Sequence, residues 1–94
     1  MTQNKKVTAS DLLLTAANMI AERSKQRDVD SERSMALAVE LFNEHNKTNM
    51  TEKQGWNFMY HLKRARSMQG SLLIDDWVDM IAYLALEAES VINK

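Results

Sequence analysis

The stretch Asp75-Asp76-Trp77-Val78-Asp79-Met80-Ile81-Ala82-Tyr83-Leu84-Ala85-Leu86-Glu87 combines the best apolar stripe of the chain with its densest group of carboxylates. At 3.6 residues per turn, its apolar side chains and those that flank it share one helical face. This face consists of Ile74, Val78, Ile81, Ala82, Ala85, Ala88 and Ile92, and a neighbouring face carries Asp76, Asp79, Tyr83 and Glu87. The pattern predicts an amphipathic helix around which the rest of the chain packs.

The carboxylates of this stretch have two interpretations. Asp75, Asp76 and Asp79 fall within two helical turns, next to Tyr83, and carboxylate oxygens are the ligands that hard divalent cations such as Mg²⁺ prefer. Acidic residues in a first turn are also expected without any ligand, because they complement the partial positive charge of a helix N-terminus. The spacing leaves both a metal or substrate site and simple helix capping open.

The composition predicts an all-α protein with a single domain. The chain has 94 residues, no proline, and only two glycines, Gly55 and Gly70, so it is poor in the residues that tight strand turns need. A domain of this size buries roughly 60 to 65% of the surface that its unfolded chain exposes. Because the core is modest, we expect four helices that gain further burial as a homo-oligomer, after a flexible N-terminus over residues 1–9.

Capping signals and apolar spacing place the four helices. We expect them from Ser10 or Thr8 to about Arg23 or Lys25, from Glu32 to about His45, from the Thr51–Gln54 capping box to Gln69, and from Ser71 or the first aspartates nearly to the C-terminus. Gly70 supplies the left-handed residue that commonly ends a helix. The expected buried seam of the second helix is Met35, Ala38, Val39 and Phe42, and the expected inward side of the third is Phe58, Leu62 and Ala65.

Charge and hydropathy exclude several classes of function. The formal net charge is −1, with 12 basic and 13 acidic residues, so there is no general attraction to nucleic acid or anionic membranes. The absence of cysteine excludes disulfides, thiolate metal sites and thiol catalysis. The longest apolar run, Met80 to Leu86, is far short of the ~20 residues that span a bilayer, and the N-terminus has no signal-peptide pattern. We therefore expect a soluble cytoplasmic protein.

The third helix carries aromatic and basic side chains along one stripe, formed by Trp56, Tyr60, Lys63 and Arg66. An aromatic ring beside cations suits a nucleotide, because the ring can stack on a base and the cations can pair with phosphate. The alternative is that Trp56 and Tyr60 belong to the core and that the cations are solvated, which is the commoner role of aromatics at helical spacing.

The segment between the first two helices is dense in mixed charge. Arg27, Glu32 and Arg33 lie close to the expected N-terminus of the second helix. A helix N-terminus attracts anions, and nearby arginines add bidentate contacts to phosphate. A solvated turn with weak salt bridges is the alternative.

A series of short motifs follows along the chain: Arg27-Asp28, Glu32-Arg33-Ser34-Met35, Phe42-Asn43, Gly55-Trp56-x-Phe58-Met59, Leu62-Lys63-x-Ala65-Arg66 and Asp75-Asp76-Trp77-Val78-Asp79-x-x-x-Tyr83. Taken together, these motifs resemble a family of small phage and prophage proteins without a settled function, over about residues 11 to 90. The last motif is also remotely similar to the MazG-like all-α NTP pyrophosphohydrolases. That similarity implies Asp76 and Asp79 as Mg²⁺ ligands, with Lys63 and Arg66 near the phosphates.

The sequence departs from the catalytic pattern of MazG-like enzymes, which bring a Glu-x-x-Glu pair from an earlier helix. No two glutamates in this chain are three residues apart. Hydrolysis of a nucleotide between its phosphates normally needs four or more carboxylates that hold metal ions. We therefore expect a nucleotide-directed helical scaffold, of phage origin by resemblance, that binds or hydrolyses a nucleotide with Mg²⁺. The alternative is a non-catalytic helical protein that binds and modulates a host protein or sequesters a nucleotide signal.

Overall fold

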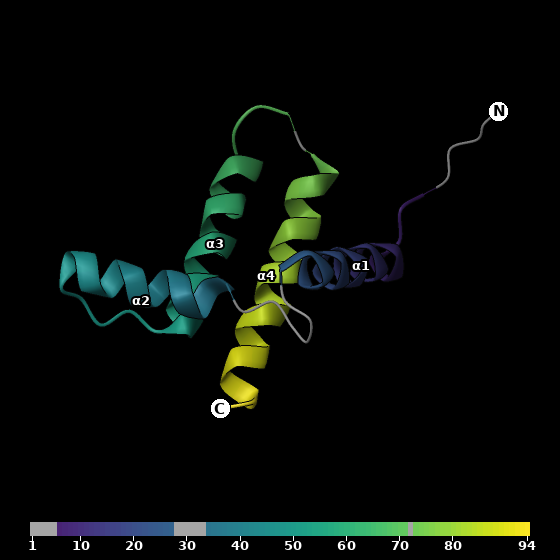
Figure 1. The fold of residues 1–94 in the computed structure, drawn as a ribbon. Helices are drawn as coiled ribbons and strands as arrows, with labels where there is room; N and C mark the ends of the chain where they lie inside the picture. The colour runs from purple at the N-terminus through teal and green to yellow at the C-terminus, as the bar shows by residue number, and fades with distance from the viewer. Residues whose placement is uncertain (1–5, 28–33, 72) are drawn as a thin grey trace.

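The computed structural model describes residues 6–27, 34–71 and 73–94. These residues form four helices and no strand: α1 (Ala9–Arg27), α2 (Ser34–Asn46), α3 (Glu52–Ser67) and α4 (Ile74–Ile92). The helices α3 and α4 pair side by side as a hairpin, while α1 packs against α4 and α2 packs against α3 (Figure 1). The predicted all-α, four-helix single domain is confirmed for the described part of the chain.

Two capping boxes fix where helices begin. The Thr51 backbone N–H donates to Gln54 Oε1 (2.9 Å), and the Gln54 N–H donates to Thr51 Oγ1 (3.1 Å). Thr8 and Asp11 make the same reciprocal pair at the start of α1, at 3.0 and 3.1 Å. Both satisfy backbone donors that a helix N-terminus leaves free. Of the N-terminus predicted to be flexible, residues 1–5 lie outside the described part, whereas Thr8 and Ala9 already belong to the cap and the first turn.

The ends of the helices differ from the predicted ones by a few residues. Helix α1 continues to Arg27, beyond the predicted end at about Arg23 or Lys25. Glu, Arg, Lys and Gln are good helix formers even without an apolar stripe. Helix α2 begins at Ser34 within the described residues and ends before Lys47, which has a left-handed φ of 55°. Helix α3 ends at Ser67, and Gly70 has the predicted left-handed backbone (φ 67°).

The core is divided into two clusters on the two sides of α4. On one side, Ala16 of α1 packs against Val78 and Ala82. On the other side, Trp56 of α3 packs against Tyr83 and Leu86. Ile20 contacts both clusters and joins them. Helix α4 therefore has the predicted central position. Its predicted apolar face is only partly buried: Ala85 and Ala88 are exposed, as are Ile74 and Ile92 at the ends, whereas Asp76 and Tyr83 of the neighbouring face are buried.

The predicted inward face of α3 is wrong. Phe58, Leu62 and Ala65 are exposed. Of the neighbouring stripe, Trp56, Tyr60 and Lys63 are buried or half-buried, and Arg66 at its end is exposed. The stripe with Trp56 offers the larger aromatic surface to α4, so α3 turns that side inward. The predicted seam of α2 is correct for Val39, which is buried, and Met35, which is half-buried, but Ala38 and Phe42 are exposed.

The molecule is open in shape. Helices α1 and α2 extend to opposite sides of the α3–α4 hairpin (Figure 1). The radius of gyration is 15.3 Å, whereas a compact domain of 94 residues has about 12 Å. No helix in residues 6–27, 34–71 and 73–94 is long and apolar enough to cross a membrane.

Candidate functional site

The predicted basic and acidic residues meet inside the α3–α4 hairpin. Lys63 Nζ lies 2.8 Å from Asp79 Oδ2, and the two side chains are only 17% and 13% exposed. Lys63 occurs on the stripe of α3 that faces α4, and Asp79 lies in the second turn of α4. The charge of Asp79 is therefore balanced by a lysine of the same chain. A cation at Asp79 would have to displace that lysine.

The three aspartates differ in their environments. Among the described residues, Asp76 is the one charged residue that is buried, with 8% exposed, whereas Asp75 is exposed. Among the residues that the structure describes, no group of three or more His, Asp or Glu side chains is placed to hold a metal ion. A three-carboxylate Mg²⁺ site does not fit this arrangement, and the metal site remains a prediction without geometric support.

Trp56 and Tyr83 lie in the core and are not free to stack on a base. Their ring centroids are 5.9 Å apart with an interplanar angle of 27°, and both residues are at least nine-tenths buried. The indole Nε1 donates to Glu52 Oε2 at 3.2 Å. Helical spacing left open whether Trp56 stacks on a ligand or belongs to the core, and the structure places it in the core.

Of the remaining predicted ligand-binding residues, only Arg66 can be placed relative to this cluster by its side chain. Arg66 is exposed near the end of α3. Its neighbour Arg64 lies over the Trp77 ring, with its Cζ 5.6 Å from the ring centroid. Arg27 is the last residue of α1, and Glu32 and Arg33 lie outside the described residues.

A small pocket of about 200 Å³ lies beside the Trp56–Tyr83 pair and is also lined by Arg23. Pockets that enclose drug-sized ligands usually have volumes of about 300–1,000 Å³. This pocket is below that range, and Arg23 is the one charged side chain among the described residues that line it. It therefore offers little room for a nucleotide.

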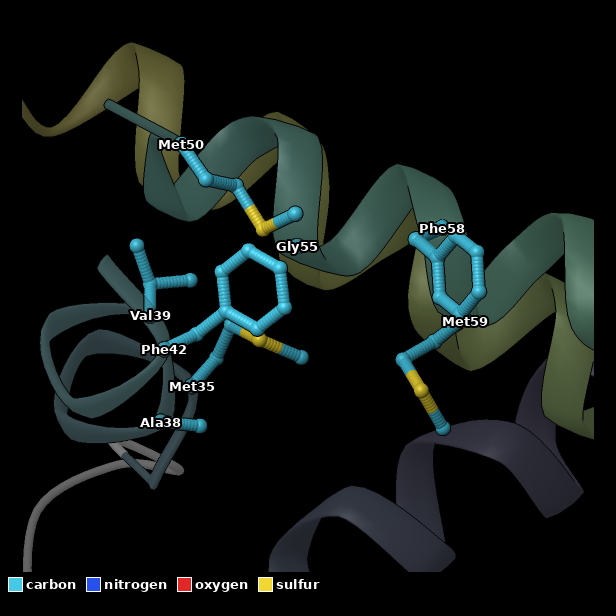
Figure 2. Close-up of a pocket in the computed structure, with 8 residues that line it drawn as sticks. All are labelled: Met35, Ala38, Val39, Phe42, Met50, Gly55, Phe58 and Met59. Atoms are coloured by element: carbon cyan, nitrogen blue, oxygen red, sulfur yellow. The ribbon is translucent and has the colours of Figure 1, made fainter. Parts of the chain in front are cut away.

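The most distinctive surface feature is an apolar groove between α2 and α3, with a volume of about 360 Å³. Its lining residues carry no charged or hydrogen-bonding side chain; they are Met35, Ala38, Val39, Phe42, Met50, Gly55, Phe58 and Met59. Figure 2 shows the side chains of Met35 and Phe42 extending from α2 toward α3, with Phe58 and Met59 farther along α3. We use the name α2–α3 groove for this surface.

Gly55 allows the two walls of the α2–α3 groove to meet. A β-carbon at Gly55 would lie 2.8 Å from Val39 Cγ2, closer than atoms of real side chains approach. Helix α2 thus contacts α3 near the first turn of α3. Toward the C-terminal end of α3, the same face of α3 stays uncovered. Phe58 and Leu62, one turn apart on that face, are 63% and 40% exposed.

Asn43 holds the segment that carries Met50 to the edge of the groove. Its Nδ2 donates to the Met50 carbonyl, and its Oδ1 accepts from the Met50 N–H and the Thr48 hydroxyl, all at 2.8 Å. The groove is therefore braced at the α2–α3 connection as well as at Gly55.

The sequence contains a signal for the groove, but its periodicity predicts interior faces. The spacing of Phe58 and Leu62 predicts the inward side of α3, and that of Met35 and Phe42 predicts a buried seam of α2. Both sets have the period of a packed helix face, yet the single chain leaves much of them open.

Comparison with known proteins gives a family and no activity. The chain belongs to a family described as a domain of unknown function (DUF6378), whose model matches residues 11–91. No curated protein and no solved structure matches the chain. The likeness to phage proteins and to MazG-like enzymes therefore stays a prediction.

Proposed function

We propose that this member of the DUF6378 family is a non-catalytic helical protein that works by binding a polypeptide in its α2–α3 groove. The observation that carries the proposal is a groove with an entirely apolar lining, bordered by the largely exposed Phe58. Apolar grooves between helices are the surfaces on which amphipathic helices dock their apolar faces. This is the protein-binding alternative that the sequence already offered.

The chemistry of the lining favours a polypeptide over a small polar ligand. Sites for small molecules place a few polar groups that orient the ligand, and phosphates need cations or N–H donors. The α2–α3 groove has no such side chain among its lining residues. Three of the lining residues are methionines, Met35, Met50 and Met59, whose flexible thioethers adapt to the irregular side chains of a partner.

The competing function is a MazG-like nucleotide site with Mg²⁺ in the cytoplasm of a phage host. It would require Asp79 to exchange Lys63 for a metal ion, and it would require carboxylates that the described residues do not bring together. The Lys63–Asp79 pair instead supports a structural role for these residues, as a link between α3 and α4.

A photoreactive phenylalanine analogue at position 58 tests the proposal, with position 14 as the matched control. Leu14 is 64% exposed and Phe58 is 63% exposed, so both probes sample solvent equally, but Leu14 lies on α1 outside the groove. In cells that express the full chain, we expect irradiation to attach the position-58 probe to a polypeptide of discrete mass. Absence of a polypeptide adduct at position 58, or equal adducts at both positions, would contradict the proposal.

A further inference from the structure

We infer that the polypeptide in the α2–α3 groove is a second copy of this chain, and that Phe58 of each copy inserts into the groove of the other about a two-fold axis. The inference rests on the proposed function, because it names the partner for the same surface. It follows from the surface area of the single chain, from the incomplete burial of its apolar residues, and from the placement of Phe58.

The single chain exposes far more surface than a compact monomer. The accessible surface summed over all 94 residues is 7193 Å². A compact monomer of 10.8 kDa exposes about 5,500 Å². A standard protein–protein interface removes about 800 Å² from each partner. The difference is therefore large enough to supply one stable interface.

The core of the single chain is also incomplete. No large side chain in the described residues has an exposure below 2%, and many large apolar side chains are more than one-third exposed. Those beside the groove are Phe42, Phe58 and Leu62, which come from two helices. A second copy that packs on this face would bury apolar surface from all three.

The placement of Phe58 makes this surface self-complementary. A two-fold interface uses the same patch on both copies, so the patch must carry both a projection and a recess. Here the projection is Phe58. The recess is the groove beside it, which is formed by Met35 and Phe42 of α2, Met59 of α3 and Met50 just before α3 (Figure 2). A large aromatic side chain buries roughly 150–250 Å² and commonly anchors an interface.

A different protein with an apolar helix could occupy the same groove in principle. Such a partner would need an apolar projection that matches the recess. A second copy already has that projection, because every molecule carries Phe58. No charged side chain lines the groove, so the approach of two identical surfaces meets no like-charge repulsion there. The second copy is therefore the occupant that these observations favour.

Light scattering on the full chain tests the inference. We expect the wild type to have twice the 10.8 kDa mass of one chain, and we expect Phe58→Asp to dimerise at least about 30-fold more weakly, the loss typical of a central anchor. Leu14→Asp has matched exposure outside the groove and should remain dimeric. Because Phe58 is exposed in the single chain, the far-UV circular dichroism of Phe58→Asp should stay helical; Leu62→Lys is a second variant on the same face.

A monomeric wild type across the concentration range would overturn the inference, as would a Phe58→Asp variant that stays fully dimeric. The photoreactive probe separates this failure from failure of the proposed function. An adduct at position 58 with twice the mass of the chain supports the second copy. An adduct with another protein overturns the second copy and leaves polypeptide binding standing, and the absence of any polypeptide adduct overturns both.

Discussion

Gly55 of α3 faces Val39 of α2 so closely that a β-carbon at Gly55 would lie 2.8 Å from Val39 Cγ2. The same β-carbon would lie 2.5 Å from the Met35 sulfur. Met35 can swing its flexible end away, but Val39 is buried and its branched side chain is stiff about χ1. The position of α2 on α3, and with it the width of the α2–α3 groove, depends on this contact.

Gly55→Ala should therefore lower the free energy of unfolding, although alanine is the better helix former by about 1 kcal/mol. Overpacking of a filled contact costs about 1–3 kcal/mol. Over most of this range, the cost exceeds the gain in helix propensity. A Val39→Ala background removes the contact with the stiff side chain and leaves only the flexible Met35 to move aside, so the same Gly55→Ala change should stabilise the protein. Urea unfolding of the four variants measures this reversal of sign. A stabilising Gly55→Ala in the wild-type background would show that α2 does not press on α3 at this point.

Asp79→Asn should destabilise the protein by about 1–3 kcal/mol, because it leaves the Lys63 ammonium largely buried without its partner. The double variant Lys63→Met/Asp79→Leu should recover most of that loss, since it removes both charges and keeps apolar volume. The control is Asp75→Asn in the same helix: its exposed carboxylate should contribute only about 0.3–1 kcal/mol through the helix dipole. A more stable Asp79→Asn, as expected for carboxylates that repel each other in an empty metal site, would favour the Mg²⁺ interpretation.

Mg²⁺ and nucleotides should leave the melting temperature of the wild type unchanged. A ligand present at 100 times its dissociation constant adds about 2.7 kcal/mol to the stability of the native state, so a real site produces a clear shift. The measurement is a thermal-shift panel of nucleotides with and without Mg²⁺, on the wild type and on Asp79→Asn. A Mg²⁺-dependent shift that Asp79→Asn abolishes would restore the nucleotide function.

Asn43→Ala should cost about 1–3 kcal/mol, because the Met50 N–H and carbonyl lose their side-chain partner in a half-buried position. The Met50 amide should exchange its hydrogen faster than the loss of global stability alone predicts. Asn46→Ala is the matched control: its amide donates to the Phe42 carbonyl at an exposed site, and its loss should have little effect. Equal exchange rates at Met50 in both variants would mean that Asn43 does not hold the connection.

The parts of the fold that depend on local chemistry could be predicted from sequence. The Thr51–Gln54 and Thr8–Asp11 caps and the left-handed Gly70 follow from side-chain reach and backbone freedom within a few residues. The central position of α4 follows from its long apolar stripe. The end of α1 at Arg27 could not be predicted in this way, because its last turns are polar on all sides and lack a stop signal.

The orientation of α3 could not be read from periodicity, because two of its faces are apolar enough to be buried. One carries Trp56 and packs on α4, and the other carries Phe58 and Leu62 and stays exposed. Which face turns inward depends on the contact between two helices, and a single helix sequence does not contain that information. The sequence assigned Asp79 to Mg²⁺ and Lys63 to phosphates, whereas the geometry pairs these two side chains with each other.

The most direct test of the account is a filtered nuclear Overhauser experiment on a mixture of two samples, one with ¹³C-labelled methionine methyl groups and one unlabelled. If Phe58 of one copy fills the groove of another, the methyl groups of Met35, Met50 and Met59 will show intermolecular contacts to an aromatic ring. Those contacts will disappear when the unlabelled chain carries Phe58→Leu and persist when it carries Leu14→Phe. Absence of intermolecular contacts in the wild-type mixture, or contacts that survive Phe58→Leu unchanged, would contradict the insertion of Phe58 into the α2–α3 groove.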